Sequence, residues 1–190
     1  MVTADGVRGD VETRSVGDWQ TLFASPETRV HAFLESLDGH DGDLFAEKRQ
    51  DYLTALRHYS RSFDSEDEVF LVRSPGRINQ MGRHVDHRGG DVNVVAISDE
   101  CIAVVSTRQD DKVELSNSMP DRFSAQKFSI GELADSLLLS SWSDCVNSPK
   151  TLALVEDGDW DNYIKPPMLR LPQRFKDQSL RGMRMTVNSN

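Results

Sequence analysis

At 190 residues the chain is long enough for one well-packed core, or for one domain with an accessory arm. Hydrophobic residues make up 37% of it, and no run approaches the roughly 20 apolar residues that a membrane-spanning helix needs. The net charge of −9 comes mostly from residues 1–70, where 15 acidic side chains outnumber 7 basic ones. Because binding to phosphates needs clustered Lys and Arg, this balance argues against nucleic acid as a partner.

The N-terminus and the two cysteines indicate the cellular compartment in which the protein is expected. The first residues, MVTADG, have neither the basic nor the apolar segment of a secretory signal. Cys101 and Cys145 lie far apart and form no disulfide framework or metal-binding spacing. We therefore expect a soluble, cytoplasmic protein that does not associate with membranes.

Helical spacing dominates the first third of the chain. Helices are expected over 18–24, 25–38 and 44–63, with Ser25 as the N-cap of the second helix and Gly39 as its end. The second helix places Phe33 on its apolar face. In the third helix, apolar residues repeat at spacings of seven, four, three and four, and predict a core stripe: Phe45, Tyr52, Leu56, Tyr59 and Phe63. Residues 1–66 are thus expected to form an acidic helical arm that leads into a lobe over 67–190.

Beyond residue 68 the apolar residues alternate with a period of two. This pattern predicts strands, followed by mixed elements, in this order: strands at 69–73, 92–97, 101–107 and 113–116, a weaker strand at 123–130, a short helix at 131–139, a loop at 140–159, a helix at 160–175 and a half-buried strand at 182–187. A polar hairpin loop is expected at 108–112. Pro166 and Pro167 must kink or restart the helix in which they fall, because an internal proline loses a hydrogen bond.

The stretch 74–90, SPGRINQMGRHVDHRGG, is the strongest candidate for a functional site. It follows an apolar strand and contains three Arg, two His, one Asp and four Gly. A strand that runs into a glycine-rich turn holds ionisable side chains on rigid backbone, where ligand sites are often built. One interpretation is a metal site formed by His84, Asp86 and His87, with Asp91 nearby, although this spacing matches no standard zinc motif.

The same stretch resembles the sugar-recognition signature of galactokinase-type members of the GHMP kinase superfamily, which usually reads PGRVNLIGEHTDYxGG. In addition, WDNY at 160–163 resembles the WxNY that opens a later helix of the family, and the similarity extends over about 44–190. The resemblance implies an α+β fold, the N-terminal lobe of a GHMP-type kinase (ribosomal S5 domain 2-like), with a mixed, largely antiparallel sheet. It also implies transfer of the ATP γ-phosphate, with Mg²⁺, to a hydroxyl of a monosaccharide, expected to be the anomeric one.

The resemblance assigns roles to particular residues. Arg77 matches the Arg that stabilises charge on the sugar oxygen and the transferred phosphoryl group. The matching sugar-binding positions are Arg83, His84, Val85, Asp86, Gly89 and Gly90. Asn117 and Ser118 fall where the nucleotide edge of the family passes. Structural alternatives stay open: an ion pair between Arg77 and the acidic arm, a backbone cap for Asp86, and a turn histidine for His84.

Two departures from the family pattern matter inside the signature. Arg83 stands where the family has Glu, and His87 stands where it has Tyr. Kinases of galacturonic acid similarly follow the Asp with His and Gly-Gly. Because Arg donates hydrogen bonds and pairs with carboxylates, a uronic acid such as galacturonate is a candidate substrate in addition to galactose. The alternative is that Arg83 turns outward and pairs with the acidic arm.

A third departure is the absence of the family's PxGxGLSSSAA phosphate-binding sequence, which is expected after 182–187. We therefore expect this chain to be a fragment truncated before that loop, or a sugar-binding or sensing protein that does not phosphorylate its ligand. In either case the strand at 182–187 is expected to leave an exposed apolar edge that favours self-association.

Overall fold

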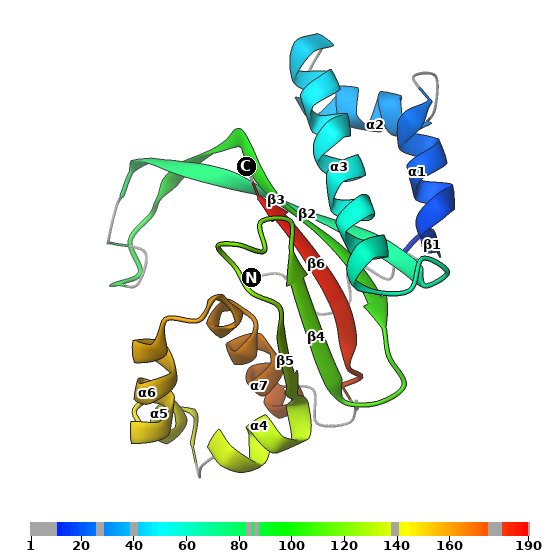
Figure 1. Ribbon diagram of the computed structural model, residues 1–190. Helices are drawn as coiled ribbons and strands as arrows, with labels where there is room; N and C mark the ends of the chain where they lie inside the picture. Colours follow the sequence, from blue (N-terminus) through cyan, green and yellow to red (C-terminus); the bar gives the residue numbers. More distant parts are fainter. Residues whose placement is uncertain are drawn as a thin grey trace.

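The computed structural model of the protein describes residues 11–25, 29–38, 42–82, 85, 88–137, 141–174 and 180–189. A six-stranded sheet with the order β1-β2-β3-β6-β4-β5 runs through it (Figure 1). Its strands are β1 (Arg14–Ser15), β2 (Glu68–Met81), β3 (Asn93–Thr107), β4 (Lys112–Asn117), β5 (Gln126–Ser129) and β6 (Met183–Ser189). Only β4 and β6 pair in parallel, so the expected α+β fold with a largely antiparallel sheet is confirmed.

Three N-terminal helices cover one face of the sheet: α1 (Val16–Ala24), α2 (Arg29–Asp38) and α3 (Gly42–Ser62). The helix α1 begins at Ser15, whose hydroxyl accepts a hydrogen bond from the Asp18 backbone N–H at 3.1 Å. The predicted stripe of α3 is confirmed, because its four members up to Tyr59 are buried in one cluster with Ile102 and Val104 of β3. Phe63, just beyond the end of the helix, is partly buried against this cluster. The division of the chain at residue 66 stays a prediction, although this cluster joins α1–α3 to β2 and β3.

A buried polar group anchors α3 to the sheet. The Tyr59 side chain is fully buried, and its hydroxyl hydrogen-bonds Asp67 at 2.7 Å and Ser106 at 2.6 Å. Burial raises the pKa of this hydroxyl, so Tyr59 stays protonated as a donor. Asp67 also accepts hydrogen bonds from the Arg184 guanidinium of β6 at 2.9 and 3.1 Å. This network joins the end of α3 to two strands of the sheet.

The other face of the sheet carries the remaining helices: α4 (Ile130–Leu137), α5 (Trp142–Val146), α6 (Pro149–Asp157), the short 3₁₀ helix η2 (Trp160–Tyr163) and α7 (Lys165–Arg174). A second core lies beneath η2 and α7, where Val105 and Met185 of the sheet pack with Ile164 and Met168. Val104 and Val105 therefore belong to different cores, as the alternation of side chains along a strand requires. No helix among the described residues has the length and apolar character needed to cross a membrane.

The loop expected at 140–159 is wrong, because this region contains α5 and α6. Ser141 is the N-cap of α5, and its hydroxyl accepts a hydrogen bond from the Asp144 backbone N–H at 3.1 Å. The Ser148 hydroxyl similarly accepts from Thr151 N–H at 3.2 Å in the first turn of α6. Both helices are short, so the polar capping residues hide the weak apolar pattern, of which buried Cys145 is one member.

Several expected boundaries also change. The strands predicted at 92–97 and 101–107 form one strand of 15 residues, β3, and β2 continues through 74–81, where the sequence predicts a turn. The strand predicted at 123–130 is limited to β5. Ser25 is the C-cap of α1, where its N–H donates to Thr21 O at 3.3 Å. Its role as N-cap of the second helix stays a prediction, because residues 26–28 lie outside the described part of the chain. Phe33, expected on the apolar face, is 57% exposed. As expected, the helix restarts at the two prolines, which lie in the first turn of α7.

The strand β6 occupies the centre of the sheet. It pairs with β3 on one side and with β4 on the other, and its Met185 is buried. The hairpin expected at 108–112 is therefore wrong, because β6 lies between the two strands that this loop joins. The exposed apolar edge expected at 182–187 is therefore not there. Self-association stays a prediction, and it would have to use a different surface.

Candidate functional site

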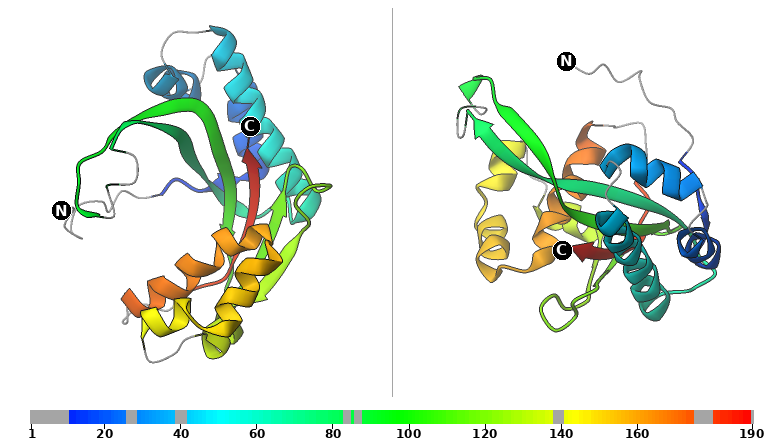
Figure 2. Two further views of the ribbon diagram at one scale, coloured as in Figure 1. Left: turned by 90° about the vertical axis from the view of Figure 1, so that its left-hand side faces the viewer. Right: turned by 90° about the horizontal axis from the view of Figure 1, so that it is seen from above.

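The signature lies on the hairpin formed by β2 and β3. This hairpin curves away from the helices and carries its turn at its far end (Figure 2). Arg77 pairs with Ala96 across the hairpin, and the pairing continues to Met81 and Asn93. The Arg77 side chain is exposed and makes no ion pair with the described part of the acidic arm. A two-stranded ladder thus holds this guanidinium on paired backbone between two register shifts, open to a ligand.

Glycines shape the turn at the end of the hairpin. Gly82 and Gly89 have positive φ angles of 83° and 79°. A Cβ atom at Gly82 would lie 2.4 Å from the backbone oxygen of Asp91, so a larger residue does not fit there. The Val85 carbonyl accepts hydrogen bonds from the N–H groups of Arg88 at 3.0 Å and Gly90 at 2.9 Å. The turn is therefore folded back on Val85, between the two glycines.

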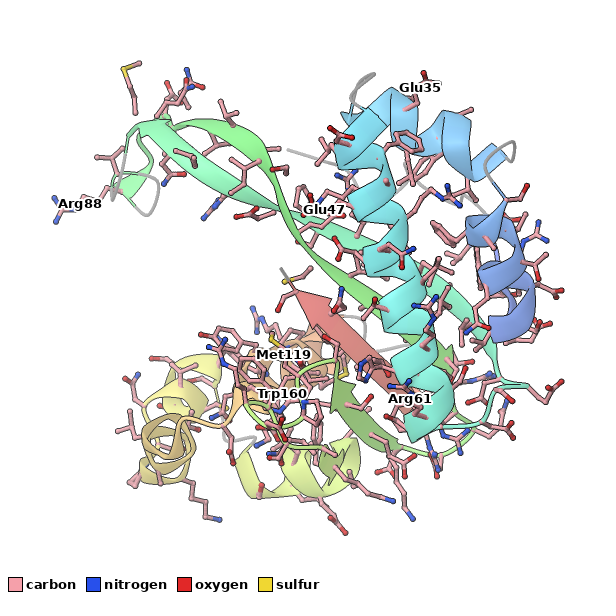
Figure 3. The ribbon with its side chains drawn as sticks, turned by 45° about the horizontal axis from the view of Figure 1, so that its top comes forward. Glu35, Glu47, Arg61, Arg88, Met119 and Trp160 are labelled. Carbon is pink, nitrogen blue, oxygen red and sulfur yellow. The ribbon has the colours of Figure 1, made fainter. Side chains whose placement is uncertain are left out.

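The structure describes only part of the predicted sugar-binding set. Val85, Gly89 and Gly90 lie in this turn, and Arg88, labelled in Figure 3, lies at its outer end. Arg83, His84 and Asp86 lie outside the described residues, as does His87. Their roles stay predictions. No group of three potential metal ligands occurs among the residues that are described, which do not include the proposed metal-binding histidines.

A β-bulge separates the outer hairpin from the main sheet. Pro75 pairs with Glu100 and Arg77 with Ala96, so Gly76 alone lies opposite three residues of β3, Ile97–Asp99. A Cβ at Gly76 would approach Ile97 Cγ1 to 2.9 Å and Asp99 O to 3.0 Å. Bulges bend a strand and increase its twist. Here the bend comes immediately before Arg77.

Asn117 and Ser118 lie at the end of β4, away from the hairpin. Asn117 pairs with Val187 of β6, and Figure 3 shows Met119 well separated from the hairpin turn. The Asn117 side chain is buried, and its oxygen accepts a hydrogen bond from Met119 N–H at 2.8 Å. The Ser118 N–H donates to Val187 O at 2.9 Å. The structure thus does not bring these two residues together with Arg77, and their nucleotide-binding role stays a prediction.

One buried charge near the hairpin was not identified from the sequence. Lys48 of α3 is only 1% exposed and pairs with Glu100 at the bulge, with 3.3 Å between Nζ and Oε1. A signal was present in the sequence: Lys48 follows Phe45 by three residues and precedes Tyr52 by four, so it falls on the apolar face. A lysine in a core stripe predicts a buried partner, which only the tertiary structure identifies.

Comparison with known proteins identifies the hairpin segment. A family model described as the galactokinase galactose-binding signature matches residues 57–107, from the end of α3 through β2 and the turn to the end of β3. The chain carries the galactokinase-type signature. The curated relatives and the solved structure described below, to which the chain is also similar, are galactokinases.

The chain is similar to curated galactokinases. The galactokinase of Candida maltosa is 26% identical over 145 residues, which cover 75% of this chain and 59% of that protein. The galactokinase of Schizosaccharomyces pombe is 32% identical over 85 residues, which cover 43% of this chain and 16% of that protein. The chain therefore spans less than two thirds of the length of these relatives.

A solved structure shares the fold. The crystal structure of Lactococcus lactis galactokinase complexed with galactose matches with a TM-score of 0.51 and 22% sequence identity. The match covers 70% of this chain and 29% of the Lactococcus chain. Together with the strand order, it shows a GHMP-type fold for the sheet that carries the signature.

Proposed function

We propose that this chain forms the sugar-recognition part of an ATP-dependent sugar kinase. The reaction is transfer of the ATP γ-phosphate to a sugar hydroxyl, the anomeric one, of galactose or of a uronic acid such as galacturonate. The observation that carries the proposal is the match to the signature over residues 57–107, a segment that includes the hairpin on which Arg77 precedes the glycine turn. The galactokinase relatives, and the galactose with which the Lactococcus enzyme is complexed, support this class of substrate.

Arg77 is the proposed catalytic residue. Phosphoryl transfer depends mainly on positioning and on stabilising negative charge in the transition state, and a fixed guanidinium contributes to both. Arg77 is exposed, and it sits one residue past the bulge on paired backbone. In this proposal Asp86 accepts hydrogen bonds from sugar hydroxyls and His84 orients one of them, while Gly89 and Gly90 allow the backbone to approach the sugar.

The complete kinase is proposed to use ATP and Mg²⁺. Asn117 and Ser118 are proposed to lie along the edge of the nucleotide, at the end of β4. The Asn117 side chain already caps a local turn, so we expect a backbone contact there rather than a side-chain one. The 190 residues contain no PxGxGLSSSAA sequence to hold the phosphates through backbone N–H groups. Calorimetry of this chain with Mg-ATP should therefore show no binding, and a micromolar dissociation constant would contradict the proposal.

Arg83 is the proposed determinant of sugar choice. If its guanidinium faces the sugar, a neutral hexose loses the carboxylate acceptor that galactokinases present and leaves a buried charge without a partner. A uronic acid supplies the missing carboxylate. Charge-assisted hydrogen bonds contribute roughly 1.5–3 kcal/mol, so a preference of about tenfold to a few hundredfold for galacturonate is expected.

The test compares kcat/KM for galactose and galacturonate in the intact kinase and in two variants. Arg83→Glu should narrow or reverse the preference for galacturonate, whereas Arg83→Lys should keep only part of it, because lysine cannot form the bidentate pair. Equal values for both sugars, unchanged in Arg83→Glu, would show that Arg83 does not touch the sugar. Turnover of neither sugar would instead favour the second candidate, a sugar-binding or sensing protein.

A further inference from the structure

A buried charged cluster lies where the hairpin leaves the main sheet. It consists of Lys48 of α3, Glu100 of β3 and Arg73 of β2, whose side chains are 1%, 1% and 17% exposed. Glu100 lies between the two cations: its Oε1 is 3.3 Å from Lys48 Nζ, and its Oε2 pairs with Arg73 Nε. Lys48 Nζ also donates a hydrogen bond to the backbone oxygen of Ser98. One helix and both hairpin strands therefore meet at a single carboxylate.

Stability alone does not account for these charges. Removing ions from water carries a desolvation cost that can exceed their mutual attraction, and apolar replacements of buried ion pairs are often neutral or stabilising. The other inward positions of α3, among them Tyr52 and Leu56, achieve burial with uncharged side chains. Buried polar groups are instead suited to selecting one geometry among several, because the wrong geometry leaves a charge without a partner.

The geometry in question is the bulge. Ser98, whose carbonyl Lys48 binds, is the middle residue of the bulged segment 97–99, and Glu100 is the first β3 residue paired after it. The segment lies opposite Gly76, and Arg77 follows at once. Glu47, next to Lys48 in the chain, is labelled in Figure 3 where α3 passes close to the base of the hairpin. The helix thus holds the point at which the hairpin bends.

We propose that Lys48 and Glu100 are positioning residues for sugar recognition. They fix the bulge at 97–99 and so set the direction in which the hairpin carries Arg77 and the glycine turn, without touching the sugar. The role in sugar binding rests on the proposed function, whereas the fixing of the bulge does not. Lys48 lies in the N-terminal arm, outside the matched signature at 57–107, so the arm becomes part of the recognition apparatus.

The test uses three variants and one control of the 190-residue chain. Lys48→Met removes the cation at similar side-chain length, and Lys48→Arg keeps it. The double variant, Lys48→Met with Glu100→Gln, removes both charges, so it does not leave the Glu100 carboxylate buried without its lysine partner. Lys127→Met is the control, because it removes a lysine from an exposed ion pair. Lys127 of β5 is 59% exposed and lies 2.6 Å from Glu114 of β4. The readouts are amide hydrogen exchange, the urea midpoint, and calorimetric affinity for galactose and galacturonate.

Local loosening at the bulge is the expected result. In Lys48→Met and in the double variant, exchange at residues 96–100 should accelerate by about tenfold or more while β4 and β6 keep their protection. Sugar affinity should fall by about fivefold to tenfold in both variants, with recovery in Lys48→Arg and no change in Lys127→Met. A purely structural role would instead lower the urea midpoint and accelerate exchange across the whole sheet.

Two results would overturn the inference, and neither depends on the other. Unchanged exchange at 96–100 in the folded double variant would show that the cluster does not hold the bulge, even if the unmodified chain binds neither sugar. Accelerated exchange with unchanged sugar affinity would show that the bulge does not position the site. If Lys48→Met does not fold, hydrogen exchange and sugar affinity are compared between the double variant and Lys48→Arg instead. Absence of sugar binding by the unmodified chain counts against the proposed function, and exchange still decides the role of the cluster.

Discussion

Replacing Gly182 with alanine tests how tightly the centre of the sheet is packed. Gly182 is buried immediately before β6, where its N–H donates to Asp110 O at 2.6 Å and its carbonyl accepts from Arg108 N–H at 2.8 Å. A Cβ there would lie 2.1 Å from the backbone oxygen of Lys112 and 2.6 Å from its nitrogen. Because these are backbone atoms at the start of β4, no side-chain rotation can relieve the clash.

The substitution lowers the free energy of unfolding because β4 and β6 must move apart to accommodate the Cβ. Overpacking of this kind typically costs about 1–3 kcal/mol, and weakening one short hydrogen bond adds about 0.5–1.5 kcal/mol. We therefore expect Gly182→Ala to lower the free energy of unfolding by about 2–4 kcal/mol. With a urea m-value of about 2 kcal/mol/M, the midpoint should fall by about 1–2 M.

Equilibrium urea unfolding, followed by circular dichroism, measures this shift. Gly42→Ala is the matched control, because a Cβ at Gly42 meets no atom within 4 Å at the start of α3. The control should stay within about 0.5 kcal/mol of the unmodified protein. A midpoint for Gly182→Ala as high as that of the control would refute the proposed close approach of β6 to β4.

Three further predictions concern the cores and the surface charges. Tyr59→Phe should lower the free energy of unfolding by about 1–3 kcal/mol, because the buried partners of the Tyr59 hydroxyl lose a hydrogen bond. Tyr163→Phe, at a side chain that is 85% exposed, should leave this free energy unchanged in the same assay. Leu56→Ala should cost about 2–5 kcal/mol in thermal unfolding, and a smaller loss would mean that its fully buried site collapses on substitution. The hydrogen bond from Lys127 lowers the pKa of Glu114 from its usual value, so the stability that Glu114 contributes is present above that usual value and is lost as the pH falls through the lowered pKa. Glu114→Gln should flatten this acid dependence, and an unchanged profile would contradict the assignment.

Local pattern was sufficient for much of the fold because it depends on which face of each element is apolar. The spacing of aromatic residues in 44–63 predicted the buried stripe of α3, and alternation predicted the strands on either side of the 108–112 loop. The signature at 74–90 indicated the segment that the family model matches, because its order of glycines and ionisable residues resembles that of the family. The pattern failed at 140–159, where two helices of five and nine residues are too short to show a period.

What the sequence determined by itself is therefore the character of each segment: an apolar stripe, a polar loop between two strands, a sugar-recognition signature. Only the tertiary structure decided which segments meet. It placed β6 between β3 and β4, although Ser116 and Thr186 lie 70 residues apart before their hydroxyls meet at 2.6 Å. It also buried Lys48 against Glu100, 52 residues later in the chain, at the bulge that directs the hairpin. The physical reason is that periodicity is a property of neighbours along the chain, whereas pairing between distant strands and the partner of a buried charge depend on contacts that form only when the chain folds.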